Sequence, residues 1–337
     1  MIEYYIHKNN VGEDWDGFIN QHQFGNAFQT SAFYDFYLKT NEFRPFYCIA
    51  RNKSSNSIIG GFLFVIQRKS TNFPDKYIRR SLIIGGPLVK NNNERVLDGL
   101  LKVYNDFTKN KVIYSEIRNL RSWSDQIDVF LRNKFKYEAH LNYQIPLKER
   151  DVVAAFSASK RRQIRKAQKN GAKIIENPDI NQVRQFYDIL SNLYNRKINK
   201  PLPDWSFFQS FYEHIVLKEL GKYLLIHFDG KIIGGIMLPK YQQSMVYEWY
   251  VAGLDKEYKH AYPSVLATWS GIKYAKGNDF NAFDFMGAGV PSHSYGVREF
   301  KSKFGGKILN YGRFVNSHYR IFYWAIKMFL KLYSKNS

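Results

Sequence analysis

The sequence is poor in cysteine and has no long apolar run. Its single cysteine, Cys48, excludes an internal disulfide and a cluster of thiolate metal ligands, which favours a reducing compartment. None of the eight histidines stands at a metal-binding spacing, so we expect no metal. No segment reaches the roughly 18 apolar residues of a membrane span, and "MIEYYIHKNN" lacks the pattern of a secretion signal. We therefore expect a cytoplasmic protein.

Acidic residues are also scarce. There are 29 Asp plus Glu against 50 Lys plus Arg, which gives a formal net charge of +21. A field of this sign attracts nucleic acid, anionic lipid headgroups and phosphorylated metabolites, and it does not choose among them. With 45% hydrophobic and 17% aromatic residues, the chain is nonetheless globular, and its 337 residues suffice for two domains.

Two segments of the sequence echo each other. Ile58–Leu63 reads "IIGGFL" and Ile232–Met237 reads "IIGGIM", each in the second arm of an expected β-hairpin, and each is followed by a strand, a helix and a strand. The echo favours duplication of one α/β unit. We predict an α/β (α+β) fold of two domains, 1–150 and 151–318, each a mixed sheet flanked by helices, and a basic amphipathic helix at 319–337.

The order hairpin, strand, helix, strand resembles the acetyltransferase-like (GNAT) fold, and two tandem copies resemble the Fem (FemABX-like) family. Members of that family are aminoacyl transferases that build peptidoglycan interpeptide bridges. The resemblance covers nearly the whole chain. It rests on five runs: "SASKRRQIRKAQKNGAKI", "YPSVLATWSGIKYAKGNDFNAFDFMGA", "YGVREFKSKFGGKI", "YSEIRN" and "GGPL".

The resemblance implies a reaction and a set of site residues. An aminoacyl group would move from aminoacyl-tRNA to an amine of a UDP-linked or lipid-linked peptidoglycan precursor, without a cofactor. Lys301 would stabilise the oxyanion beside the reacting carbonyl, with Phe300 shaping the site and Asp284 orienting it. The remaining substrate-binding candidates are Lys39 and Arg196, as ligands of the acceptor's diphosphate, and Tyr295. Solvated or structural roles for Lys301, Arg196 and Asp284 stay open.

A stretch rich in Lys and Arg opens the second predicted domain. In a helix, Arg161, Arg165 and Lys169 would share one face, and Arg162 and Lys166 would form a neighbouring row. Like charges at this spacing repel, and a polyanion would offset the cost. Together with Lys160, these residues are candidates for phosphate contacts to tRNA; a solvated surface helix is the alternative. The basic helix at 319–337 suits either a peripheral membrane contact at the inner face of the membrane or packing on the second domain.

Two further interpretations remain open. An acyl-CoA-dependent N-acyltransferase acting on an amino sugar in surface-polysaccharide synthesis would need a glycine-rich loop that cradles the pyrophosphate at a helix N-terminus. That place holds "DKEYKHAYPS" instead, which disfavours acyl-CoA. The other is a non-catalytic basic protein that binds nucleic acid or membrane. For it, Lys301→Ala would be harmless, and neutralising Arg161, Arg162 and Arg165 would abolish function.

Overall fold

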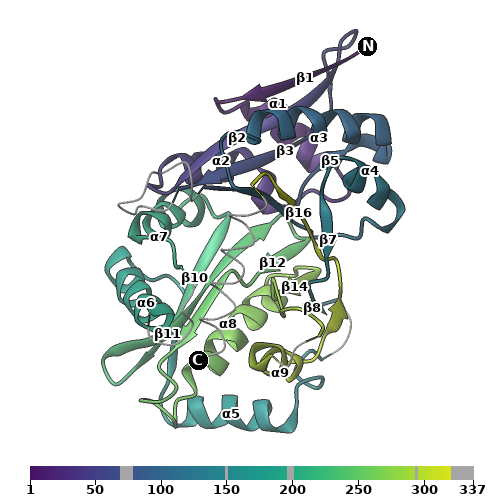
Figure 1. Cartoon of the computed structure of the whole chain (residues 1–337). Helices are drawn as coiled ribbons and strands as arrows, with labels where there is room; N and C mark the ends of the chain where they lie inside the picture. The colour runs from purple at the N-terminus through teal and green to yellow at the C-terminus, as the bar shows by residue number, and fades with distance from the viewer. Residues whose placement is uncertain (69–78, 149–150, 196–200, 293–294, 320–337) are drawn as a thin grey trace. The chain divides into compact units, whose positions relative to one another are not determined.

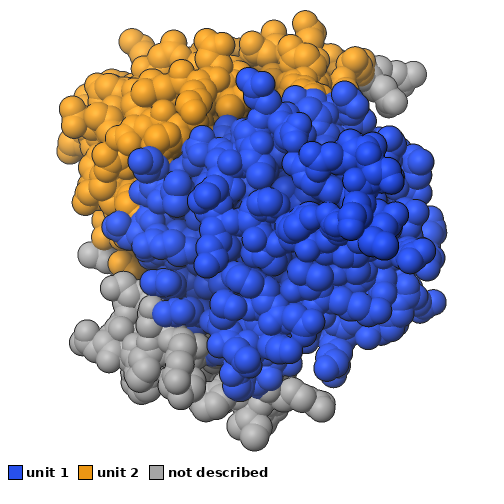
Figure 2. Space-filling view, turned by 90° about the horizontal axis from the view of Figure 1, so that it is seen from above, with its two compact units in different colours: residues 1–139, 311–337 blue, residues 140–310 orange. Residues whose placement is uncertain are grey.

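A computed structural model describes residues 1–68, 79–148, 151–195, 201–292 and 295–319. The chain divides into two compact units (Figure 2): unit 1 comprises Met1–Ala139 and Tyr311–Ser337, and unit 2 comprises His140–Asn310. The described residues contain no helix that is long and apolar enough to cross a membrane. The predicted helix at 319–337 falls, apart from Tyr319, outside the described residues, and so does Arg196.

Unit 1 is an eight-stranded mixed sheet with helices on both faces (Figure 1). The sheet order is β1-β2-β3-β4-β6-β16-β7, and β5 pairs with β3; β4 and β6 run parallel. The elements are β1 Ile2–His7, α1 Gly12–Gln21, η1 Ala27–Gln29, α2 Ser31–Leu38, β2 Phe43–Asn52, β3 Ile58–Gln67, β4 Arg80–Ile84, β5 Leu88–Val89, η3 Lys90–Asn92, α3 Glu94–Thr108, β6 Tyr114–Arg118, η4 Ser124–Gln126, α4 Ile127–Arg132, β7 Lys136–Glu138 and β16 Arg313–Ser317.

Unit 2 repeats this scheme. Its sheet order is β15-β8-β14-β12-β11-β10-β9, with β13 paired to β11 and β12 parallel to β14. The elements are β8 Asn142–Pro146, α5 Ala158–Lys169, β9 Lys173–Ile175, α6 Ile180–Leu193, α7 Trp205–Phe211, the π-helix η6 Tyr212–Val216, β10 Gly221–Phe228, β11 Lys231–Tyr241, β12 Met245–Tyr247, β13 Tyr250–Gly253, α8 Pro263–Gly277, β14 Ala282–Asp284, α9 Gly296–Ser302 and β15 Lys307–Leu309.

The repeated Gly-Gly pair has the same role in both units. A Cβ on Gly60 would lie 2.9 Å from Val96 of α3, and one on Gly61 would lie 2.6 Å from the Cys48 carbonyl and 2.9 Å from the Trp15 ring of α1. In unit 2, the corresponding atom on Gly235 would meet Phe186 of α6 at 3.0 Å. Successive glycines point to opposite faces of the strand, so each pair lets two helices pack closely, one on each face. The sequence echo therefore reflects a repeated packing geometry.

Two strands belong to the other unit than the predicted domain bounds imply. β8 precedes residue 150 but pairs with β14 and β15 of unit 2, and β16 precedes residue 318 but pairs with β6 and β7 of unit 1. The division at residues 139 and 310 therefore differs from the predicted bounds of 150 and 318. Alternating apolar residues show that a strand forms, whereas its neighbour in the sheet is decided by tertiary packing.

Candidate functional site

Lys301 is the centre of a buried polar cluster in unit 2. It lies on α9, and the residue is 7% exposed. Its ammonium donates to the carbonyl oxygens of Phe285, at 2.5 Å, and Gly287, at 2.8 Å, and it lies 3.4 Å from Glu248 Oε1. Lys301 thus makes two hydrogen bonds to backbone carbonyls and an ion pair with Glu248, and it fixes the segment after β14 against α9.

Glu248 is the carboxylate of this cluster, and it was not among the predicted site residues. It stands between β12 and β13, where its backbone N–H donates to the Asp284 carbonyl at 2.8 Å. Its Oε2 accepts from the Thr268 hydroxyl at 3.2 Å. Burial raises the pKa of Glu248, and the ammonium of Lys301 offsets part of that rise. The available signal was a lone charge in the apolar strand "SMVYEWYVAGL", since such a residue is seldom buried without a partner.

Asp284, a predicted orienting residue, is fully buried at the end of β14. It accepts hydrogen bonds from Asn142 Nδ2 at 2.7 Å, from Gln144 Nε2 at 2.7 Å and from the Met286 backbone N–H at 2.6 Å. Burial raises its pKa, and these three bonds oppose the rise. Asp284 therefore holds β8 and the segment that begins at Met286, and it acts on the Lys301 cluster through that segment.

The other predicted residues of the α9 region lie around this cluster. The Phe300 ring is half-buried and lies 4.0 Å, at its centroid, from the Lys160 ammonium. Tyr295 precedes α9, is half-buried and packs closely against Gly289, where a Cβ would lie 2.8 Å from its ring. Burial and the nearby Tyr295 raise the pKa of Tyr194 to about 12. Lys39 is exposed after the end of α2, in unit 1.

The structure divides the six cations predicted on α5. Arg162, Arg165, Lys166 and Lys169 are exposed. Lys160 is only 6% exposed, because it lies four residues before the buried Ile164 and shares its face of the helix. Burial lowers the pKa of Lys160 to about 8, and the neighbouring Lys303 adds to this effect.

Arg161 is turned back onto the preceding loop, where Nη1 donates to the carbonyls of Ala154 at 2.9 Å and Phe156 at 2.6 Å. A polyanion approaching α5 therefore meets the four exposed side chains.

The N-terminus of α8 is the place where an acyl-CoA pyrophosphate would be held in this type of sheet and helix arrangement. Pro263 brings no N–H to the first turn, and the Ser264 N–H and hydroxyl donate to the two Asp255 carboxylate oxygens at 3.1 and 2.5 Å. A Cβ on Gly253 would lie 2.4 Å from the Ser264 nitrogen, so β13 packs directly on this turn. The Asp255 carboxylate takes both Ser264 donors and places a negative charge at this turn, which opposes the binding of a pyrophosphate here.

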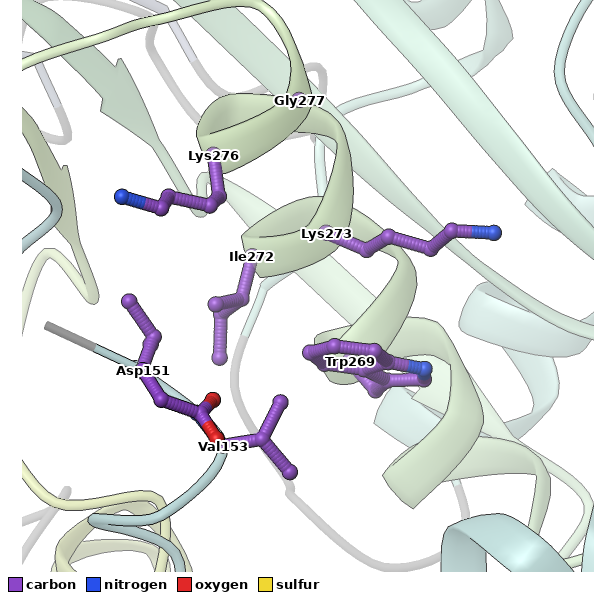
Figure 3. Close-up of a pocket in the computed structure, with 8 residues that line it drawn as sticks. Asp151, Val153, Trp269, Ile272, Lys273, Lys276 and Gly277 are labelled. Atoms are coloured by element: carbon purple, nitrogen blue, oxygen red, sulfur yellow. The ribbon is translucent and has the colours of Figure 1, made fainter.

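A pocket of about 250 Å³ opens on another part of unit 2 (Figure 3). It lies between α8 and the segment around Val152, and Trp269, Ile272, Lys273 and Lys276 are among its lining residues. None of the predicted site residues lines it. Among the residues that the structure describes, no group of three or more His, Cys, Asp or Glu side chains is arranged to hold a metal ion.

Comparison with known proteins shows what this chain is similar to in sequence and in fold. Residues 155–302 match the family model described as Acetyltransferase (GNAT) domain, so this part of the chain is similar to an acetyltransferase domain, in agreement with the predicted acyltransferase. No curated protein matches the chain. The crystal structure of FemX has a TM-score of 0.70 at 16% identity, over 96% of this chain and 99% of that one.

Two other solved structures are also similar. The C-terminal domain (DUF2156) of a putative lysylphosphatidylglycerol synthetase from Agrobacterium fabrum has a TM-score of 0.55 at 12% identity, over 90% and 91% of the chains. A tandem GNAT protein from the clavulanic acid biosynthesis pathway has a TM-score of 0.58 at 9% identity, over 94% and 99%. At such identities the likeness concerns the fold. The prediction of a tandem, FemABX-like GNAT fold is confirmed.

Proposed function

We propose that this protein is an aminoacyl transferase that moves an aminoacyl group from aminoacyl-tRNA to an amine of a peptidoglycan precursor. The observation that carries the proposal is the closed N-terminus of α8, where Asp255 takes the donors that acyl-CoA would need. A GNAT domain without this cradle requires another activated acyl donor. The net charge of +21 and the four exposed cations of α5 favour a polyanionic one.

The proposed reaction requires few catalytic groups from the protein. The acceptor amine attacks the ester carbonyl carbon, a C–N bond forms, the C–O bond to the tRNA ribose breaks, and the proton lost by the amine ends on the ribose oxygen. The protein aligns amine and carbonyl and stabilises the oxyanion between these steps. Lys301 is the proposed source of that positive charge. Glu248 is the most distant of its three partners, at 3.4 Å, and is the contact that would break when the ammonium turns to the oxyanion.

The proposed acceptor is a cell-wall precursor, UDP-linked or lipid-linked, and the fold likeness to FemX supports this choice. Lys39 and Arg196 remain the proposed ligands of its diphosphate, and a peripheral contact with the inner face of the membrane would bring a lipid-linked precursor within reach. The likeness to the putative lysylphosphatidylglycerol synthetase supports a lipid as the second candidate acceptor for the same aminoacyl chemistry.

The proposed donor predicts how the protein responds to acetyl-CoA. Saturating acetyl-CoA should leave the thermal unfolding midpoint of the full chain unchanged, because the α8 N-terminus has no place for the pyrophosphate. Aminoacyl-tRNA at a hundred times its dissociation constant should add about 2.7 kcal/mol of stability. Differential scanning calorimetry at fixed ionic strength measures both. A rise with acetyl-CoA alone would instead support the acyl-CoA-dependent N-acyltransferase that acts on an amino sugar.

A further inference from the structure

Among the residues that the structure describes, several buried polar atoms without hydrogen-bond partners lie at one end of the unit 1 sheet. This end holds the carboxyl ends of the parallel strands β4 and β6 and the loop before η1. The atoms are Asn26 Oδ1, Asn119 Oδ1, and Nε and Nη2 of Arg121. Asn26 is 2% exposed and Asn119 is 8% exposed. Because buried polar groups in folded proteins almost always have a partner, a cluster of unpartnered ones suggests a ligand.

Hydrogen bonds tie these residues to the strand ends. Asn26 Nδ2 donates to the Gly85 carbonyl at 2.8 Å, directly after β4, and the Gly85 N–H donates to the Arg118 carbonyl at 2.9 Å, at the end of β6. Gly85 has a φ of +70°, and a Cβ there would lie 2.5 Å from Asn26 Oδ1. The unpartnered amide oxygen therefore lies against the end of β4, in a place that only glycine leaves open.

Arg121 is held by two aromatic rings. Its guanidinium carbon Cζ lies 4.2 Å from the centroid of the Phe24 ring and 3.6 Å from that of Trp123. In the part of the chain that the structure describes, no carboxylate lies within 4.0 Å of it. Burial lowers the pKa of Arg121 to about 10, and the nearby Asp125 opposes this fall. Arg121 therefore stays cationic at neutral pH.

The two unpartnered nitrogens belong to one edge of the guanidinium. Nε and Nη2 form the fork that binds carboxylate or phosphate through two parallel hydrogen bonds. The fork is closed to solvent, so an anion that reaches it need not strip water from the guanidinium, although the side chains that shield the fork must move. The rings hold the plane of the fork in one orientation, which lowers the entropy lost on binding.

Arg184 of unit 2 shows the contrasting arrangement. Its Cζ lies over two aromatic rings as well, at 5.2 Å from the centroid of Tyr187 and 5.0 Å from that of Trp205. Its Nε donates to Asp188 Oδ1 at 3.2 Å, and its side chain is 50% exposed. Arg184 has the acceptor that a purely structural arginine needs, whereas Nε and Nη2 of Arg121 have none among the described residues.

We propose that Arg121 binds an anionic group, carboxylate or phosphate, of a ligand that lies at the carboxyl ends of β4 and β6. The amide oxygens of Asn26 and Asn119 would accept hydrogen bonds from N–H or O–H groups of the same ligand. The identification of this ligand as the acceptor rests on the proposed function, because a peptidoglycan precursor carries both a diphosphate and a peptide carboxylate. The anion site itself follows from the geometry of unit 1 alone.

The test compares two anions on the full chain and two variants. The probes are pyrophosphate and N-acetyl-D-alanyl-D-alanine, each at saturating concentration with ionic strength held constant by NaCl. The variants are Arg121→Met and, as matched control, Arg184→Met. One probe should raise the unfolding midpoint of the wild type and of Arg184→Met by about 5 °C, and that of Arg121→Met by less than about 1 °C. The effective probe identifies the anion as phosphate or carboxylate.

Three outcomes would overturn the proposal: neither probe raises the midpoint of the wild type, the rise persists in Arg121→Met, or Arg184→Met loses it equally. If Arg121→Met does not fold, Arg121→Lys serves instead. It keeps the charge without the fork and should weaken binding of the effective probe at least tenfold in calorimetric titration; unchanged binding contradicts the proposal. If an anion binds at Arg121 but no aminoacyl group is transferred, the anion site holds and the proposed function is wrong. If aminoacyl transfer occurs but no anion binds at Arg121, the proposed function holds and the anion site is wrong.

Discussion

Lys301→Met should lower the free energy of unfolding by about 3–5 kcal/mol, because it leaves Glu248 buried without its cation and the carbonyls of Phe285 and Gly287 without their donor. The double variant Lys301→Met/Glu248→Gln should recover a large part of this loss, since it removes both charges. The exposed Lys303, two residues away, provides the control, and Lys303→Met should change stability by less than about 0.5 kcal/mol. Urea unfolding of these proteins measures the losses, and the single variant Glu248→Gln completes the double-mutant cycle that gives the coupling between the two residues.

The loss in Lys301→Met should also depend on pH. Burial raises the pKa of Glu248 in the folded state, and in Lys301→Met the ammonium that lowers this pKa is gone. The folded variant therefore keeps a proton on Glu248 that the unfolded state releases. Stability then falls as the pH rises from the usual range of a carboxyl through the raised value. A loss that is equal at all pH values, or a double variant as unstable as the single one, would contradict the buried ion pair.

Neutralising the exposed cations of α5 should weaken tRNA binding about 100-fold at 0.15 M salt. The variant carries glutamine at four positions: Arg162, Arg165, Lys166 and Lys169. If all four contact phosphates, the slope of the logarithm of the binding constant against the logarithm of salt concentration should fall by about 3–4 in magnitude. Fluorescence titration at several salt concentrations measures both quantities. Lys160 is left in place because it is buried on the inner face of α5.

A second variant with four exposed lysines of unit 1 replaced by glutamine controls for net charge; the positions are Lys90, Lys109, Lys134 and Lys136. If tRNA binds α5, this control should retain most of the affinity and of the salt dependence. An equal loss in both variants would mean that net charge alone attracts the RNA, and α5 would then be an ordinary solvated helix.

Much of the fold could be predicted because local patterns agree with it. α3 begins directly after Asn93, whose side-chain Oδ1 caps the helix by accepting a hydrogen bond from the Val96 N–H. Asp179 and Gln182 form a capping box at the start of α6. The Gly-Gly echo predicted the duplicated unit because each pair meets helices on both faces. The exchange of β8 and β16 between the units left no local signal, because strand partners are chosen by long-range packing.

The candidate site was only partly accessible from the sequence. The motif around Lys301 pointed to a functional residue, but its partner Glu248 lies 53 positions away and is brought to it by the sheet. Lys160 was grouped with the surface cations, although its spacing of four residues from Ile164 places it on the apolar face of α5. The contacts of Arg161 with the preceding loop exist only in the folded chain. The sequence did not indicate a role for Arg121, because an isolated arginine in a loop belongs to no recognisable pattern. Its clamp between Phe24 and Trp123 exists only in the folded chain.

The most direct test of the central claim is a transfer assay with the purified full chain. The labelled group is offered either as aminoacyl-tRNA or as acetyl-CoA, to the UDP-linked and the lipid-linked peptidoglycan precursor in turn, and amide formation is followed by mass spectrometry. The account predicts a precursor heavier by one amino-acid residue with charged tRNA, and no acetylated product with acetyl-CoA. Acetylation of an amine by acetyl-CoA, without any transfer from charged tRNA, would contradict it.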